Sequence, residues 1–201
     1  MSYYPIMLQL DGKKVIVVGG GKVAERKVNG LIGSGACIEV ISPETTPGLK
    51  RLADDGKILW HQRSFLKTDC EGAFLIFAAT DHPQINQDVK GSVGPNQLVM
   101  LADDHEHSDF HVPSRMQRGR LTIAVSTEGA SPILASQIRN QLEEQFDEDY
   151  EEYLEFLFVK RQWILKEVKD GAMKRKFLQE ITSPKFLNSD DREEDFKKLL
   201  T

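Results

Sequence analysis

Cysteine is scarce in this chain, which has only two, Cys37 and Cys70, in 201 residues. Because they are so few and so far apart, they predict neither a disulfide framework nor a zinc site, and we expect two ordinary thiols. Long apolar runs are also missing, since no stretch reaches the roughly 18 residues that a membrane span needs. The N-terminal stretch, MSYYPIMLQL, has no basic region and no long apolar core, so we expect no signal peptide there.

Positive charge is not in excess either. The chain has 26 lysines and arginines against 31 aspartates and glutamates, which gives a formal net charge of −5 at pH 7. This balance lacks the basic footprint of a nucleic-acid-binding domain, so we expect no nucleic-acid partner. Together with the missing membrane span, it predicts a soluble, cytoplasmic protein. The length allows one or two domains with a sizeable core.

The most informative stretch runs from Val15 to Lys27, VIVVGGGKVAERK. A β-branched strand leads into three glycines and a helix-forming segment follows at once, an order typical of the entrance to a dinucleotide site. We expect Gly19 to permit the tight turn. Gly21 would let the backbone approach a pyrophosphate, whose charge meets the free N–H groups of the new helix. Ala24 is small enough for that helix to pack closely on the sheet. The alternative is a strand-to-helix turn that binds nothing.

Hydrophobic periodicity and turn residues divide the first half of the chain into alternating elements. Strands are predicted over 4–10, 14–18, 37–42, 58–63, 73–80 and 97–101, and helices over 23–32, 47–55 and 83–93. The first two strands are joined by Asp11-Gly12, a hairpin-type turn signal. Strands that alternate with helices predict an α/β fold with a parallel sheet and helices on both faces.

The regular alternation of predicted strands and helices ends after Asp103. Strands are predicted over 110–113 and 120–126, separated by a basic turn over 114–119. A helix then begins at Ser131-Pro132, with the serine as its cap and the proline at its first position. From about residue 146 the pattern is helical and heavily charged, and its many acids predict a solvated helical face.

In open α/β sheets ligands bind where the strands end, so the residues that follow the predicted strands are candidate site residues. Ser42, Pro43 and Glu44 follow the strand over 37–42. NAD sites usually place an acid about twenty residues beyond the glycines, and Glu44 is near that distance. No arginine stands beside it to receive a 2′-phosphate, which favours NAD over NADP. Thr80 ends the strand over 73–80 and could lie along the cofactor or simply begin the next helix.

The strand over 97–101 leads into ADDHEHSDFH, residues 102–111, which is rich in histidines and carboxylates. Such side chains bind divalent metals, but a solvated loop is the more common setting for them, and we expect no dedicated metal site. A carboxylate at a strand end that faces a nicotinamide suits general-base chemistry. Asp103 and Asp104 are therefore the candidate catalytic residues. The alternative is that both merely cap the loop.

Four segments together resemble the precorrin-2 dehydrogenases of sirohaem biosynthesis. They are GGGKVAERK at 19–27, FAAT at 77–80, ADDHEHSDFHVP at 102–113 and IAVSTEGASPILASQIR at 123–139. The resemblance implies oxidation of precorrin-2 to sirohydrochlorin with NAD⁺ as cofactor. The family includes stand-alone dehydrogenases, bifunctional dehydrogenase–ferrochelatases and the N-terminal module of sirohaem synthase.

The resemblance also implies an architecture of three parts. It predicts an NAD-binding Rossmann domain over 1–113, a small α+β dimerisation domain over 114–146 and a helical C-terminal domain over 147–201. We therefore expect a homodimer. The family's glycine pattern places Lys22 and Val23 at the cofactor, and its second-strand contacts fall on Pro43 and Glu44.

By motif position, the family's essential aspartate falls on Asp103, and the adjacent Asp104 stays open. The serine-rich turn before the helix falls on Ser126 and Thr127, where substrate would lie. One departure is Met100, because many members have asparagine three residues before the aspartate.

Precorrin-2 is a polyacid, so its site should offer cations and helix N-termini. Arg115, Arg118 and Arg120 are candidate substrate-binding residues, and hairpin surface is the alternative. Two other functions stay open. A bifunctional enzyme would also insert Fe²⁺ or Co²⁺ with Asp103 or a nearby histidine as base, whereas a dinucleotide-sensing domain would need neither the Asp103 loop nor the serine-rich turn.

Overall fold

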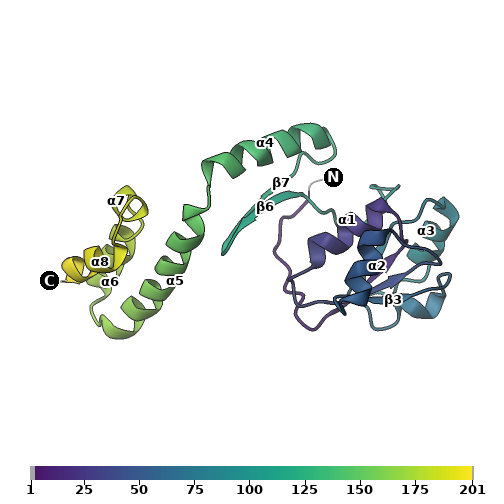
Figure 1. The fold of residues 1–201 in the computed structure, drawn as a ribbon, viewed down its shortest axis with the longest axis horizontal. Coiled ribbons are helices and arrows are strands. Elements are labelled where there is room, and N and C mark those ends of the chain that lie inside the picture. The colour runs from purple at the N-terminus through teal and green to yellow at the C-terminus, as the bar shows by residue number, and fades with distance from the viewer. Residues whose placement is uncertain (1–2, 201) are drawn as a thin grey trace. The chain divides into compact units, whose positions relative to one another are not determined.

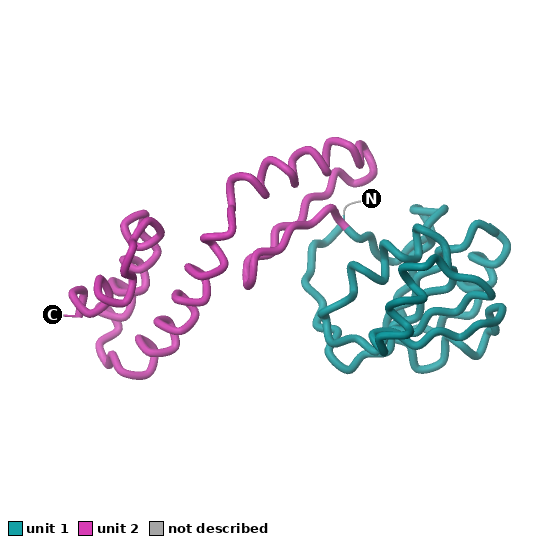
Figure 2. The backbone as a smooth tube through the Cα atoms, in the orientation of Figure 1, with its two compact units in different colours: residues 1–112 teal, residues 113–201 magenta. Residues whose placement is uncertain are grey.

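The computed structural model describes residues 3–200 and divides the chain into two compact units, Met1–Val112 (unit 1) and Pro113–Thr201 (unit 2) (Figure 2). Unit 1 contains a five-stranded parallel sheet in the order β3-β2-β1-β4-β5. Its strands are β1 (Lys14–Val18), β2 (Cys37–Ile41), β3 (Leu59–His61), β4 (Leu75–Ala78) and β5 (Leu98–Leu101). Its helices are α1 (Lys22–Leu31), α2 (Pro47–Asp54), α3 (Pro83–Lys90) and the short 3₁₀ helix η1 (Lys67–Cys70) (Figure 1). The predicted α/β class with a parallel sheet is confirmed.

Both faces of this sheet are buried, which is why its strands are near-continuous apolar runs. Val15 and Val17 of β1 face a core cluster shared with α1 and α2. Ile16 and Val18 face the opposite cluster, where Val89 of α3 packs. Alternate residues of one strand therefore anchor helices on opposite faces of the sheet.

The register of the sheet brings four strand ends to one edge. Val18 pairs with Ile41 of β2 on one side and with Ala78 of β4 on the other. Ala78 in turn pairs with Leu101 of β5. The loops that follow these four strands consequently leave the same edge, and the strand order reverses between β1 and β4. Ligands bind at this switch point in open α/β sheets.

Unit 2 starts with an antiparallel pair, β6 (Ser114–Arg118) and β7 (Leu121–Val125). Five helices follow: α4 (Pro132–Gln145), α5 (Asp149–Glu167), α6 (Gly171–Glu180), α7 (Pro184–Leu187) and α8 (Arg192–Leu200) (Figure 1). Aromatic and aliphatic side chains of α5 to α8 form a third core, and in it the Tyr153 hydroxyl donates to the carbonyl of Ile181 at 2.9 Å. None of the helices that the structure describes is long and apolar enough to cross a membrane.

The strand predicted over 4–10 is wrong, because this segment has no regular structure where it is described. The Asp11-Gly12 turn would fold it back beside β1, but both edges of β1 are already paired, with β2 and with β4. Most of its side chains accordingly lie outside the core, and Tyr4 is 86% exposed and Met7 73%, whereas Leu10 at its end packs in the core.

The predicted strand over 110–113 and basic turn over 114–119 are also wrong. The strand begins one residue after Pro113, and Ser114–Arg118 is β6 itself. Only Met116 of β6 is buried, between the exposed Arg115 and Gln117. The alternation was therefore present but contained a single apolar residue, too few to stand out as a strand pattern.

Candidate functional site

The glycine loop after β1 is shaped by two close backbone contacts. Gly19 has φ of +126°, in the region that side chains disfavour, and a Cβ there would overlap the carbonyl oxygen of Ala79 after β4. Its N–H donates to the Ile41 carbonyl at 3.0 Å. A Cβ at Gly20 would overlap the carbonyl oxygen of Glu44. The loop thus lies directly against the chain segments that leave β2 and β4.

The N-terminus of α1 has the features that a dinucleotide phosphate requires. Gly21 is the N-cap and provides no side-chain cap, so the N–H groups of the first turn are left for a ligand. A Cβ at Gly21 would meet no protein atom within 4 Å, so the backbone is approachable there. Lys22 and Val23 are exposed, whereas Ala24 is fully buried against the sheet. These residues fit a pyrophosphate at the start of α1.

The loop after β2 is held in place by its own polar groups. The Ser42 hydroxyl is buried and donates to the carbonyl of Glu44 at 2.6 Å, so it shapes the loop. Thr46 N–H donates to the Gly20 carbonyl at 2.9 Å and ties this loop to the glycines. Pro43 and Glu44 themselves are exposed. The Glu44 side chain is therefore exposed in the loop that leaves the carboxyl end of β2.

Thr80 follows β4 and is hydrogen-bonded to Asn86, a residue that the sequence pattern did not single out. Asn86 of α3 is fully buried. Its Oδ1 accepts from the Thr80 N–H at 3.2 Å and from the Thr80 hydroxyl at 2.8 Å, while its Nδ2 donates to the Thr80 carbonyl at 3.2 Å. The sequence offered one signal for Asn86. It stands three residues before Val89, on the buried face of the same helix, and a polar side chain buried there needs hydrogen-bond partners.

The two candidate catalytic aspartates differ in their contacts. Asp104 accepts from the backbone N–H of His107 at 3.2 Å, and its carboxylate lies 2.8 Å from that histidine's Nδ1. Desolvation raises the pKa of Asp104, but the hydrogen bonds from His107 outweigh it and hold the pKa below its usual value. Asp103 is exposed, and within residues 3–200 its carboxylate has no hydrogen bond or ion pair. Asp103 is thus available to a ligand, whereas Asp104 maintains the loop.

The rest of this loop folds back onto β5 through contacts that the sequence did not reveal. Asp109 accepts from the Val99 N–H at 2.9 Å and from Lys90 at 3.0 Å. The ring of Phe110 meets Phe77 of β4 edge-on, with centroids 5.3 Å apart. These contacts hold the C-terminal end of the segment that carries Asp103 against the sheet, while β5 fixes its beginning.

The serine-rich turn in unit 2 caps the N-terminus of α4 through side-chain hydrogen bonds. The Thr127 hydroxyl donates to the Ser131 carbonyl at 3.0 Å and accepts from the Ser131 N–H at 3.1 Å. Ser131 caps α4 by accepting from the Leu134 N–H at 3.1 Å, and Pro132 follows it, so the predicted helix start is confirmed. Ser126 is exposed and accepts from the N–H two residues later.

Arg118 and Arg120, two of the candidate substrate-binding arginines, pack within unit 2. Arg120 is 2.6 Å from Glu155 and stacks over the ring of Phe158, 3.6 Å from its centroid. Arg118 is half-buried and lies 3.6 Å from Glu143 of α4. These two arginines therefore contribute to the packing of unit 2. The third candidate, Arg115, is exposed on β6.

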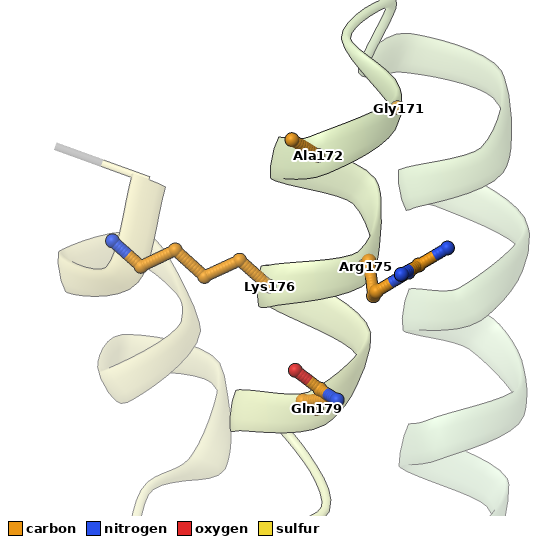
Figure 3. A pocket seen from close by; sticks show the side chains of 5 residues that line it. All are labelled: Gly171, Ala172, Arg175, Lys176 and Gln179. Carbon is orange, nitrogen blue, oxygen red and sulfur yellow. The ribbon is translucent and has the colours of Figure 1, made fainter.

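A surface hollow on α6 contains none of the predicted site residues. It is lined by Gly171, Ala172, Arg175, Lys176 and Gln179. The side chains of Arg175 and Lys176 extend to opposite sides of the helix, so its polar groups do not converge on one point (Figure 3). Within the described part of the chain, no group of three or more histidine, cysteine or acidic side chains is placed to hold a metal ion.

Comparison with known proteins identifies the family. The precorrin-2 dehydrogenase of Priestia megaterium is 32% identical over 197 residues, which is 98% of each chain. The chain belongs to the precorrin-2 dehydrogenase family. That of Bacillus subtilis (strain 168) is 36% identical over 146 residues, covering 73% of this chain and 90% of the relative. A solved structure of SirC, precorrin-2 dehydrogenase, has a TM-score of 0.85 at 31% identity and covers 98% of this chain and 99% of its own.

Three family models match in succession. An NAD(P)-binding model covers residues 6–114, a model of the central part of sirohaem biosynthesis proteins covers 118–145, and a SirC C-terminal domain model covers 150–196. The resemblance carried by the four sequence segments is thereby confirmed, and so is the class of enzyme, an oxidoreductase. The cofactor of this precorrin-2 dehydrogenase family member is a nicotinamide dinucleotide.

Proposed function

We propose that this protein catalyses the NAD-dependent dehydrogenation of precorrin-2 to sirohydrochlorin in sirohaem biosynthesis. One observation carries the proposal: the glycine loop, the Thr80 segment and the exposed Asp103 carboxylate follow strands that end at the same edge of one sheet. The relatives named precorrin-2 dehydrogenase support the substrate. A dinucleotide whose pyrophosphate meets α1 can extend along this edge in both directions.

We infer that NAD is preferred over NADP. Glu44 is exposed in the loop after β2, and residues 42–46, SPETT, include no arginine or lysine. A carboxylate can accept hydrogen bonds from both ribose hydroxyls, but it repels a 2′-phosphate. The expected cofactor contacts are thus Glu44 at the ribose, Gly19 to Ala24 at the pyrophosphate and Thr80 beyond them.

The reaction removes a hydride and a proton from the reduced macrocycle. The nicotinamide, when bound, supplies the hydride acceptor. The Asp103 carboxylate takes the proton as general base, because it is exposed and has no partner among the described residues that would compete for it. Asp104 stays hydrogen-bonded to His107 and keeps the loop in shape.

Unit 2 is proposed to supply substrate contacts and the homodimer interface. Ser126 is exposed beside the α4 cap, and Arg115 is exposed on β6. Thr127, Arg118 and Arg120 have contacts within unit 2 that hold its surface in shape, and they stay candidate substrate contacts beside Ser126 and Arg115. A two-stranded sheet is marginal alone, and the edges of β6 and β7 can pair with a second copy.

The test is an anaerobic assay in which purified protein, precorrin-2 and NAD⁺ are followed by absorbance. We expect NADH and sirohydrochlorin to appear together. Asp103→Ala should lower turnover by about 10²-fold or more while NAD⁺ still binds, because a general base contributes that much. Unchanged turnover in the variant would exclude Asp103 as the base, and NAD⁺ binding without any wild-type turnover would favour the sensor. Fe²⁺ or Co²⁺ insertion faster than a protein-free control would show chelation as well.

A further inference from the structure

The second turn of α1 carries a half-buried lysine that is paired with no carboxylate of the described residues. Lys27 stands one residue before Val28, which is fully buried against the sheet. Burial lowers the pKa of Lys27, and the adjacent Arg26 lowers it further. Within residues 3–200, no acid pairs with its ammonium group. A cation that is partly removed from water without a counter-charge costs free energy, and this cost needs a compensating interaction.

Other half-buried lysines of unit 1 do have acidic partners. Lys14 lies 3.6 Å from Glu39, and Lys90 lies 3.0 Å from Asp109. The side chains of these two lysines are 30% and 31% exposed. Lys14 and Lys90 are therefore neutralised by nearby acids of the chain, whereas Lys27 has no such acid among the described residues.

His111, in the loop after β5, is near enough to feel the charge of Lys27, and His105 lies beside His111. Nδ1 of His105 is 3.4 Å from Nδ1 of His111. Phe110, next to His111, packs against the same core cluster as Val28, which brings this part of the loop to α1. Burial lowers the pKa of His111, and the nearby His105 and Lys27 lower it further. Three groups that can carry positive charge thus lie together, and no acid of residues 3–200 is hydrogen-bonded or ion-paired to any of them.

We propose that Lys27 and His105 bind an anionic oxygen ligand while His111, whose Nε2 is buried, holds His105 through their Nδ1 contact, and that this ligand is a peripheral carboxylate of the tetrapyrrole substrate. These three residues are called the 27/105/111 cluster. The proposal rests on the proposed dehydrogenase function. His105 follows Asp103 by two residues, so a macrocycle that meets Asp103 lies beside the cluster. A substrate carboxylate supplies the missing counter-charge through charge-assisted hydrogen bonds.

The phosphates of the dinucleotide offer the same anionic chemistry but have another site. They are expected at the first turn of α1, whereas Lys27 lies six residues beyond the N-cap Gly21. At 1.5 Å per residue this is roughly 9 Å along the helix axis. The distance favours the substrate as the source of the anion.

The decisive variants remove charge without removing packing. Lys27→Met keeps the apolar stem and helix propensity of the lysine. We expect it to raise the KM for precorrin-2 by about tenfold, the effect of one lost hydrogen bond to a charged group, with little change in kcat or in the Kd of NAD⁺. His105→Gln should act in the same direction, and Lys27→Arg should restore a KM near that of the wild type. Lys50→Met, at an exposed lysine of α2, is the matched control and should leave KM unchanged.

Fluorescence titration with NAD⁺ and thermal unfolding distinguish a substrate contact from a cofactor contact and from a purely structural role of the charge. A weaker Kd for NAD⁺ with an unchanged KM for precorrin-2 would overturn the assignment to the tetrapyrrole. A clear fall in the Tm of Lys27→Met would mean that the charge serves the fold, and would also overturn it. An unaltered KM in both charge-removing variants would refute the cluster alone, while absence of NADH formation by the wild-type protein would refute the proposed function as well.

Discussion

Hydrogen bonds distinguish the two adjacent aspartates that we propose as candidates for the base. The carboxylate of Asp104 is committed to His107 on the same loop. Using it as a base would break these contacts, because a protonated carboxyl no longer accepts at both oxygens. The Asp103 carboxylate bears no such commitment within the described residues. Asp103 and Asp104 differ only in their contacts in the fold, so the sequence Asp-Asp alone does not show which of them is free to bind a ligand.

At the residue scale, we expect Asn86 to position Thr80 for the cofactor. Asn86→Ala removes three hydrogen bonds to Thr80. The backbone N–H and carbonyl of Thr80 then lose the side chain that they bond. The variant should lose about 1–3 kcal/mol of unfolding free energy and bind NAD⁺ about tenfold more weakly. Chemical denaturation and NAD⁺ titration measure the two effects. Gln84→Ala, at an exposed position of the same helix, should change neither. Unchanged NAD⁺ affinity in a folded Asn86→Ala protein would refute the positioning role.

Asp69 should make unit 1 sensitive to acid. Hydrogen bonds from Arg63, at 2.6 and 2.8 Å, hold the pKa of Asp69 below its usual value. Because the folded-state pKa is depressed, the contribution of Asp69 to stability is present above the unfolded-state pKa of about 4 and is lost as pH falls through the folded value. Asp69→Asn should therefore lower Tm at pH 7 and flatten its fall between pH 5 and pH 3, as followed by circular dichroism. An equally steep fall in the variant would contradict this.

At the scale of elements, the sequence predicted what local patterns encode. The strands of the sheet are apolar runs bounded by turn residues, and the start of α4 carries its own cap at Ser131-Pro132. Residues 4–10 have the same apolar character, but whether a run becomes a strand depends on a free neighbour, and β1 had none. The prediction missed β6 for the opposite reason. Its one buried residue, Met116, made the alternation of apolar and polar residues too weak to indicate a strand.

Gly19 and Gly21 of the β1–α1 loop should respond differently to the same substitution. Gly19→Ala is strained at φ of +126° and meets the Ala79 carbonyl, so we expect a loss of several kcal/mol in unfolding free energy or failure to fold. Gly21→Ala has φ of −82° and meets no protein atom within 4 Å, so stability should stay within about 1 kcal/mol.

NAD⁺ affinity completes the comparison of the glycines. The added methyl group at position 21 would stand where we propose that the pyrophosphate approaches, so Gly21→Ala should weaken NAD⁺ binding at least about tenfold in a folded protein. Isothermal titration and thermal unfolding on the same sample measure both quantities. Normal NAD⁺ binding by Gly21→Ala would place the pyrophosphate elsewhere.

At the scale of the whole molecule, the site depends on contacts between distant segments. Asp109 joins β5 and α3, and Asn86 joins α3 to the end of β4. Neither leaves a periodic signal, because a side chain that bonds the backbone of another element follows no spacing rule. The placement of the glycine loop and of Asp103 at strand ends could be predicted, because each follows a recognisable strand. The shape of the loops around them required the fold.

Unit 1 has the parts of an independent domain. It contains the whole parallel sheet, both of the core clusters that cover its faces, and all of the proposed cofactor contacts. A fragment of residues 1–112 should therefore unfold cooperatively and bind NAD⁺ within about threefold of the full chain. It should not oxidise precorrin-2, because the proposed contacts from Ser126 and Arg115 and the β6–β7 edges are missing. Calorimetry, NAD⁺ titration and the anaerobic assay test the three statements. Precorrin-2 oxidation by the fragment would confine the complete site to unit 1 and remove unit 2 from the proposed mechanism.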